Sequence, residues 1–117
     1  MRDRGAATIL VLAFGLFLTM AGVAAAAVGA ARVGRHAART AADLGALAGA
    51  AQAVFGPELA CARAEQLVTA NAGRMTACAV DGLEITVRAE VVVRAVPGLD
   101  RRAVATARAG PVSAPPP

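Results

Sequence analysis

The most prominent feature of the hydropathy pattern is a long uncharged stretch near the start of the chain. No residue from Gly5 to Ala31 is charged, and the strongest apolar run begins at Ile9. A helix that crosses the hydrocarbon core of a membrane needs about 20 mostly apolar residues. The pattern therefore predicts a single transmembrane helix, which we place at residues 6–31.

A cleaved signal peptide is the alternative interpretation of the same stretch. A basic start, an apolar middle and a small-residue site such as Ala24-Ala25-Ala26 are typical of signal peptides. Two features favour a retained anchor. The uncharged run is longer than a usual signal core, and the helical pattern continues beyond it without a break.

This continuation has a heptad-type period. No proline interrupts the chain before Gly56-Pro57, so we expect one helix from Ala6 to Val54, about 74 Å long at 1.5 Å per residue. Its stripe should pack on the head near Leu44 to Val54 and on neighbouring subunits nearer the membrane. The stripe consists of Val33, Ala37, Thr40, Leu44, Leu47, Ala51 and Val54.

Small residues four positions apart add a second candidate contact inside the anchor. Gly22 pairs with Ala26, and Ala25 pairs with Gly29. Such pairs let helices approach closely in lipid, although an alanine-rich helix also produces them by chance. The candidate helix-packing residues are therefore Gly22, Ala26, Gly29, Val33, Ala37 and Thr40.

The remaining chain predicts a small helix-and-sheet unit. Pro57 fits the first turn of a second helix, which should run to about Ala72 with Gly73 as its cap. A short strand at 76–80, a hairpin turn at Asp81-Gly82, an alternating strand at 83–94 and a third strand at 102–109 follow. The alanines of the third segment also permit a helix. The predicted fold class is α+β, with a three-stranded antiparallel sheet.

The two cysteines are expected to bond to each other. In a two-residue hairpin Val80 would face Leu83 and Cys78 would face Ile85, which directs Cys78 to the apolar face of the sheet. Cys61 shares a helix face with residues 64 and 68, which must cover that sheet. One disulfide in a small domain beyond an anchor indicates an oxidising compartment. Two buried free thiols are the alternative.

Composition argues against several classes of function. All twelve basic residues are arginines scattered along the chain, and the aromatic residues are three Phe, so nucleic-acid binding is not supported. There is no Cys/His cluster for a metal and no glycine-rich phosphate loop after a strand. The single histidine, His36, lies off the stripe, and the single serine, Ser113, lies in a proline-rich tail. We expect no enzymatic activity and no cofactor.

The order of these parts resembles a known family. "RGAATILVLAFGLFLTM" leads into "AARVGRHAARTAADLGALAGA", then a helix with "AC", a "VDGL" hairpin and a strand ending "ARAGP". From about Arg4 to Pro111 the chain is similar to the TadE-like proteins of actinobacteria, small relatives of the TadE and TadG pseudopilins of tight-adherence (Flp) pilus systems. The resemblance implies a pilin-like, membrane-anchored minor component.

One position departs from the family pattern. Pseudopilin processing usually cuts after a glycine that has a glutamate five residues later. Gly5 is a possible processing site, but Leu10 occupies the position of that glutamate. This departure calls into question both cleavage and entry into a filament, and it favours an uncut protein that supports assembly.

The expected organisation has four parts. Residues 1–31 form the N-terminal tail and transmembrane helix, 32–55 an amphipathic stalk, 56–110 a small extracytoplasmic head and 111–117 a disordered tail. We expect a single-pass protein of the cell membrane with a cytoplasmic N-terminus. It would be a structural or assembly component of a Tad/Flp-type pilus or secretion system. Its partners would be lipid, other membrane subunits of that system and copies of itself. A secreted small binding module is the alternative.

Overall fold

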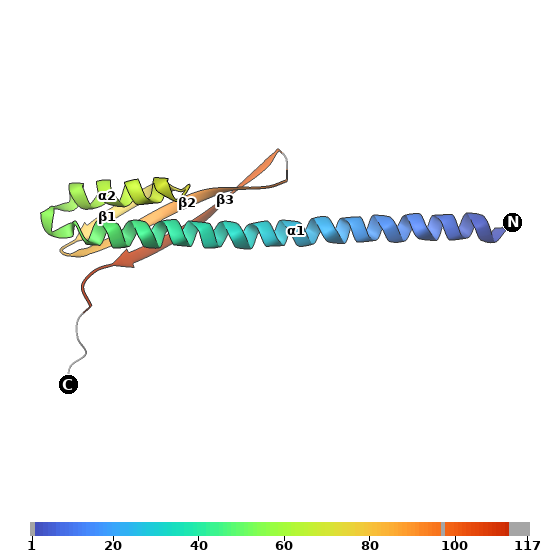
Figure 1. The fold of residues 1–117 in the computed structure, drawn as a ribbon, viewed down its shortest axis with the longest axis horizontal. Coiled ribbons are helices and arrows are strands. Elements are labelled where there is room, and N and C mark those ends of the chain that lie inside the picture. Colours follow the sequence, from blue (N-terminus) through green and yellow to red (C-terminus); the bar gives the residue numbers. More distant parts are fainter. Residues whose placement is uncertain (1, 97, 113–117) are drawn as a thin grey trace, which may run out of the picture.

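A computed structural model describes residues 2–96 and 98–112 of an elongated molecule about 82 Å long. Its elements are α1 (Arg2–Ala50), a 3-10 turn η1 (Ala53–Phe55), α2 (Pro57–Ala70), β1 (Arg74–Asp81), β2 (Glu84–Val96) and β3 (Leu99–Ala109). Figure 1 shows α1 along the whole molecule, with the other elements gathered beside its C-terminal half. The predicted α+β arrangement is confirmed. Most of the tail expected to be disordered, residues 113–117, lies outside the described residues.

The first helix has the predicted length but lies four residues earlier in the chain. It begins at Arg2, because the charged start continues the helix and Asp3 lies in the first turn, where the helix dipole favours an acidic side chain. It ends at Ala50. There the hydrogen bonding changes to the tighter 3-10 pattern, in which the Gln52 N–H donates to the Gly49 carbonyl at 2.9 Å. Val54 therefore belongs to η1 and not to the long helix.

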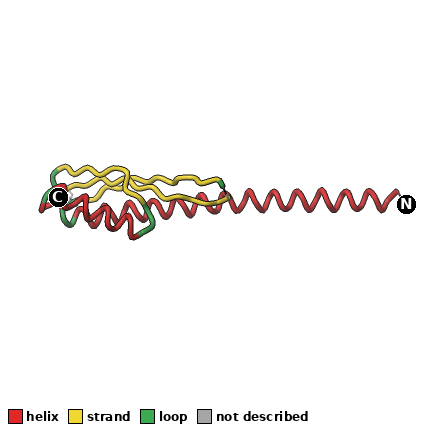
Figure 2. The backbone as a smooth tube through the Cα atoms, turned by 90° about the horizontal axis from the view of Figure 1, so that it is seen from above, coloured by secondary structure: helices red, strands yellow, loops and turns green. Residues whose placement is uncertain are grey.

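The head has two layers. The sheet is antiparallel in the order β1-β2-β3, and α1 and α2 lie side by side on one of its faces (Figure 2). α1 contacts β2 and β3, while α2 contacts β1. The third strand is confirmed as a strand: its alanines alternate inward, and Ala107 is buried opposite Val87.

The first hairpin turns one residue later than predicted. Gly82 and Leu83 are the two loop residues, between the paired Asp81 and Glu84. Gly82 has φ 62°, as the first central position of a type II′ turn requires. Cys78 therefore pairs with Val87 instead of Ile85. The partner shifts by two residues, which preserves the face, because side chains alternate with a period of two.

The expectation that the heptad stripe packs on the head is wrong. In the part from Leu44 to Val54, Val54 is 70 % exposed, Leu47 is 62 % exposed and Leu44 is 38 % exposed, so these larger members point away from the sheet. The buried face of α1 is made of small residues instead. We call it the small-residue face; its members are Gly34, Ala38, Ala41, Ala42, Gly45, Ala46 and Gly49.

Close approach of the layers explains why this face is small. A Cβ at Gly49 would lie 2.5 Å from Ile85 Cδ1 and 2.9 Å from the Ala60 carbonyl oxygen. A Cβ at Gly45 would lie 2.6 Å from Val68 Cγ2, and one at Gly34 would overlap a methyl group of Val93. Larger residues would push α2 and the sheet away from α1.

The end of α2 also differs from the prediction. The left-handed residue is Ala72, with φ 58°, and not Gly73. The Ala72 N–H donates to the Thr69 carbonyl at 3.1 Å, and the Gly73 N–H donates to the Val68 carbonyl at 2.9 Å, which together form a Schellman motif. Gly73 is required for space: a Cβ there would lie 3.0 Å from Val68 Cγ1 and 3.1 Å from Ala41 Cβ.

Candidate functional site

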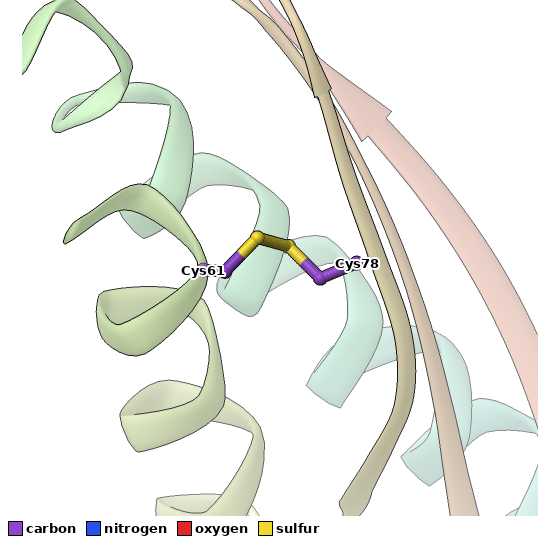
Figure 3. Close-up of a disulfide and its surroundings, with 2 residues drawn as sticks. All are labelled: Cys61 and Cys78. Atoms are coloured by element: carbon purple, nitrogen blue, oxygen red, sulfur yellow. A yellow bond between two sulfur atoms is a disulfide. The ribbon is translucent and has the colours of Figure 1, made fainter. Parts of the chain in front are cut away.

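The predicted disulfide is present in the structure. Cys61 of α2 and Cys78 of β1 are bonded, with their Cα atoms 6.0 Å apart and a separation of 17 positions in sequence (Figure 3). Both side chains are half-buried against the core that Ala60, Ala64 and Val68 form with the sheet. The bond fastens α2 to the edge strand β1, which α1 does not cover.

No catalytic or metal-binding arrangement occurs among the described residues. His36 is exposed on α1, and Ser113 lies outside the described part of the chain. Within that part, no group of three His, Cys, Asp or Glu side chains is placed to hold a metal ion. Every buried polar side-chain atom there has a hydrogen-bond partner.

The first half of α1 is the largest apolar surface. Residues 3–26 are exposed on all sides, including Ile9, Phe14 and Phe17, each more than 60 % exposed. Among the described residues, α1 is the one helix long and apolar enough to cross a membrane, and its most apolar window is entirely exposed. An all-round apolar helix is typical of a membrane span.

The candidate helix-packing residues occupy different environments. Gly22 and Gly29 have open space where a Cβ would lie, and Ala26 is exposed. Further along, Val33 is exposed, while Ala37 and Thr40 are half-buried at the border of the small-residue face. None of the six belongs to the buried core of the head, so their proposed role in contacts with other subunits stays a prediction.

The possible processing site lies near the start of the helix. Gly5 is exposed, and a Cβ at this position would meet nothing within 4 Å beyond its own helix and its chain neighbours. Leu10, five residues later, is 71 % exposed. Of the residues that a cut after Gly5 would remove, Asp3, Arg4 and Gly5 are exposed.

The outer face of the sheet is polar and paired. Glu90 accepts from Arg74, with a 2.7 Å ion pair, and lies 3.8 Å from Arg102. Arg108 pairs with Glu84 across the β2–β3 ladder. Exposed pairs of this kind contribute little to stability, typically below about 1 kcal/mol. They give the sheet a solvated face opposite the helices.

Sequence reasoning missed the small-residue face, although its signal is present in the chain. Gly34, Ala38, Ala41, Gly45 and Gly49 recur at steps of three and four, which places them on one side of a helix. A search for large apolar residues passes over this pattern, because glycine and alanine occur throughout the helix. Which face of α1 is buried depends on how closely α2 and the sheet approach α1, and the sequence does not state that distance.

Comparison with known proteins gives one match. Residues 5–52 match a family model described as "Putative Flp pilus-assembly TadE/G-like". No curated protein and no solved structure matches the chain. The match covers α1, while the cysteines and the hairpin lie outside it.

The matched segment is the part of the chain in which one helix serves first as an exposed apolar rod and then as the support of the head. It is also the segment that carries the arginine- and alanine-rich stretch on which the resemblance in sequence depends. Over residues 5–52 the chain is thus similar to the TadE/G-like proteins of Flp pilus assembly.

Proposed function

We propose that the protein is a membrane-anchored, non-enzymatic, pseudopilin-like component that takes part in the structure or assembly of a Tad/Flp-type pilus or secretion system. The family match suggests Flp pilus assembly as the process. The observation that carries the proposal is the continuity of α1. Its residues 5–26 are exposed and uncharged, and its residues 34–50 carry the face on which α2 and the sheet pack.

Continuity links position in the membrane to position in an assembly. A helix without a break between anchor and head transmits the orientation of one to the other, whereas a flexible linker would not. Subunits whose anchors pack through Gly22, Ala26 and Gly29 would thereby hold their heads in a defined relation. The exposed stripe around Val33 extends that packing surface beyond the membrane.

The head is proposed to lie outside the cytoplasm. Arginines occur on both sides of the apolar stretch, so the positive-inside rule does not decide the orientation. The Cys61–Cys78 bond favours an oxidising compartment for the head, which leaves the N-terminus in the cytoplasm.

Two measurements on the native protein test the anchor. The protein should stay in the membrane fraction through a carbonate wash, and its intact mass should correspond to the full chain or to a chain shortened by five residues. A soluble protein that has lost about 26 residues would refute the anchor. It would favour the secreted binding module, since a cut after Ala26 removes only exposed residues and spares the core.

A pair of variants tests the assembly role. Gly29→Leu places a large side chain where space is open, so it should weaken crosslinking to pilus-system components without reducing insertion, because leucine is more apolar than glycine. Arg88→Ala, on the outer face of the sheet, is the control and should leave crosslinking unchanged. The reverse pattern would make the head the recognition element and the helix a tether.

A further inference from the structure

The β2–β3 hairpin leaves a groove between its tip and α1. In Figure 1 the end of β2 and the start of β3 reach along α1 toward its N-terminal half and diverge from the helix. The groove has a volume of about 520 Å³. Its apolar walls are Ala27, Val28 and Ala31 of α1 on one side, and Val93 of β2 with Leu99 and Ala103 of β3 on the other.

Arginines line the same groove at its head-side end. They are Arg35 of α1 and Arg101 of β3. The next residue, Arg102, also borders the groove, but its side chain lies 3.8 Å from Glu90 on the outer face of the sheet. Arg35 and Arg101 have no carboxylate within ion-pair distance among the described residues, and Asp100, beside Arg101, pairs with Arg94 at 3.8 Å. The groove therefore combines apolar walls with positive charge that no acidic side chain in the described ranges neutralises.

The depth of this groove relative to a membrane follows from the length of the anchor. Twenty helical residues span about 30 Å, the thickness of the hydrocarbon core, so a core that begins at Ala6 ends near residue 25. A hairpin tip has backbone groups that hydrocarbon would leave unsatisfied, and such an edge does not lie in the core. Residues 27–31 and the hairpin tip would thus lie together in the headgroup layer.

We propose that this groove binds one anionic phospholipid from the leaflet on the head side of the membrane. Arg35 and Arg101 would hold the phosphate, since guanidinium groups match phosphate oxygens in shape and charge. The upper part of an acyl chain would lie along Ala27 and Val28 and continue into the membrane. The proposal rests on the membrane anchoring of the proposed function, and it assigns the hairpin a role in fixing the height and rotation of the head.

The test is lipid selectivity of the full chain in nanodiscs made of phosphatidylcholine with a minor share of phosphatidylglycerol. Native mass spectrometry measures the ratio of the two lipids that stay bound to the released protein. Arg35→Gln/Arg101→Gln should lower the preference for phosphatidylglycerol about tenfold or more, since each arginine near an anionic surface contributes roughly fivefold. Ala31→Leu keeps the charge, fills the groove and should also reduce the bound lipid.

The matched control removes two arginines elsewhere on the head. Arg63 lies on α2, where it donates to Gln66, and Arg88 lies on the outer face of the sheet. Arg63→Gln/Arg88→Gln should keep the wild-type preference. An unchanged ratio in the groove variants, or an equal loss in the control, overturns the proposal. A wild-type protein that washes off the membrane in carbonate would instead contradict the anchor, so the two failures are distinguishable.

Discussion

Residues 3–26 and residues 34–50 belong to the same helix, but their side chains meet different surroundings. In the first region large apolar residues such as Leu12 and Phe17 are exposed on every side. In the second region Leu47 is exposed, while Gly45 and Ala46 are buried. Along residues 34–50 of α1, the buried positions are therefore the ones with small side chains, and the larger apolar side chains are exposed.

The difference has a physical cause in the spacing of the layers. α2 approaches α1 through Ala60 and Ala64, and the backbone carbonyls of both lie within 3.1 Å of where a Cβ would stand on Gly45 or Gly49. Such an interface gains contact between backbones and loses the area that large side chains would bury. The first region has no such neighbour in the described chain, so its apolar surface is available to lipid or to other helices.

The largest expected effect on head stability comes from removing the disulfide. The bond lies in the head, so its loss should leave residues 3–26 unaffected. Cys61→Ser or Cys78→Ser should lower the free energy of unfolding of the head by about 3 kcal/mol, as expected for a loop of this length. Denaturant unfolding in detergent, followed by circular dichroism, measures the loss. The first region should stay helical throughout. Free reaction of both native thiols with a maleimide would contradict the bond.

Gly49→Leu tests the small-residue face directly. The added side chain meets Ile85 and the Ala60 carbonyl, and overpacking of this kind should cost about 2 kcal/mol of head stability. Gly22→Leu is the matched control in the first region, where nothing lies within 4 Å of the new Cβ. Equal head stability in both variants would mean that the two layers are not in close contact.

A smaller and stabilising change is expected at the end of α2. Ala72 has φ 58°, which costs a residue with a Cβ more than it costs glycine. Ala72→Gly should therefore raise the free energy of unfolding by about 0.5–1 kcal/mol, after the larger entropy loss of glycine is subtracted. Urea midpoints of the variant and the wild type give the difference, and a decrease would argue against the left-handed conformation.

The smallest effect is expected on the exposed stripe. Leu47 is 62 % exposed, so Leu47→Gln should change head stability by no more than about 0.5 kcal/mol. Ala46→Gln, at the neighbouring buried position, is the comparison and should destabilise the head clearly, since it forces a large polar side chain into the core. Similar unfolding midpoints for the two variants would contradict the assignment of buried and exposed faces.

Much of the fold follows from local pattern. The anchor, the break at Gly56-Pro57, the alternating strand and the pairing of Cys61 with Cys78 all depend on composition and period, which the sequence states directly. The predicted Cys61–Cys78 bond is correct although the predicted turn position is wrong. The strand partner of Cys78 differs by two residues, so its side chain still lies on the predicted face of the sheet.

What sequence could not supply was distance between elements. The choice between two faces of α1 depends on how closely α2 and the sheet approach, and on that point the pattern of large residues misled. The left-handed conformation of Ala72 instead of Gly73 has the same origin. Gly73 is required by space and not by its backbone conformation, since a Cβ there would lie against Val68 and Ala41. The groove beside Arg35 and Arg101 depends on the divergence of the hairpin, which no local signal records.

Amide hydrogen exchange of the full chain in nanodiscs tests most directly whether one helix is both anchor and core. With the disulfide intact, residues 6–25 and residues 34–50 should both exchange slowly. After reduction, exchange should accelerate in residues 34–50, whose protection depends on the head, and stay slow in residues 6–25, which lipid protects. Acceleration along the whole of α1, or rapid exchange of residues 6–25 before reduction, would contradict the account.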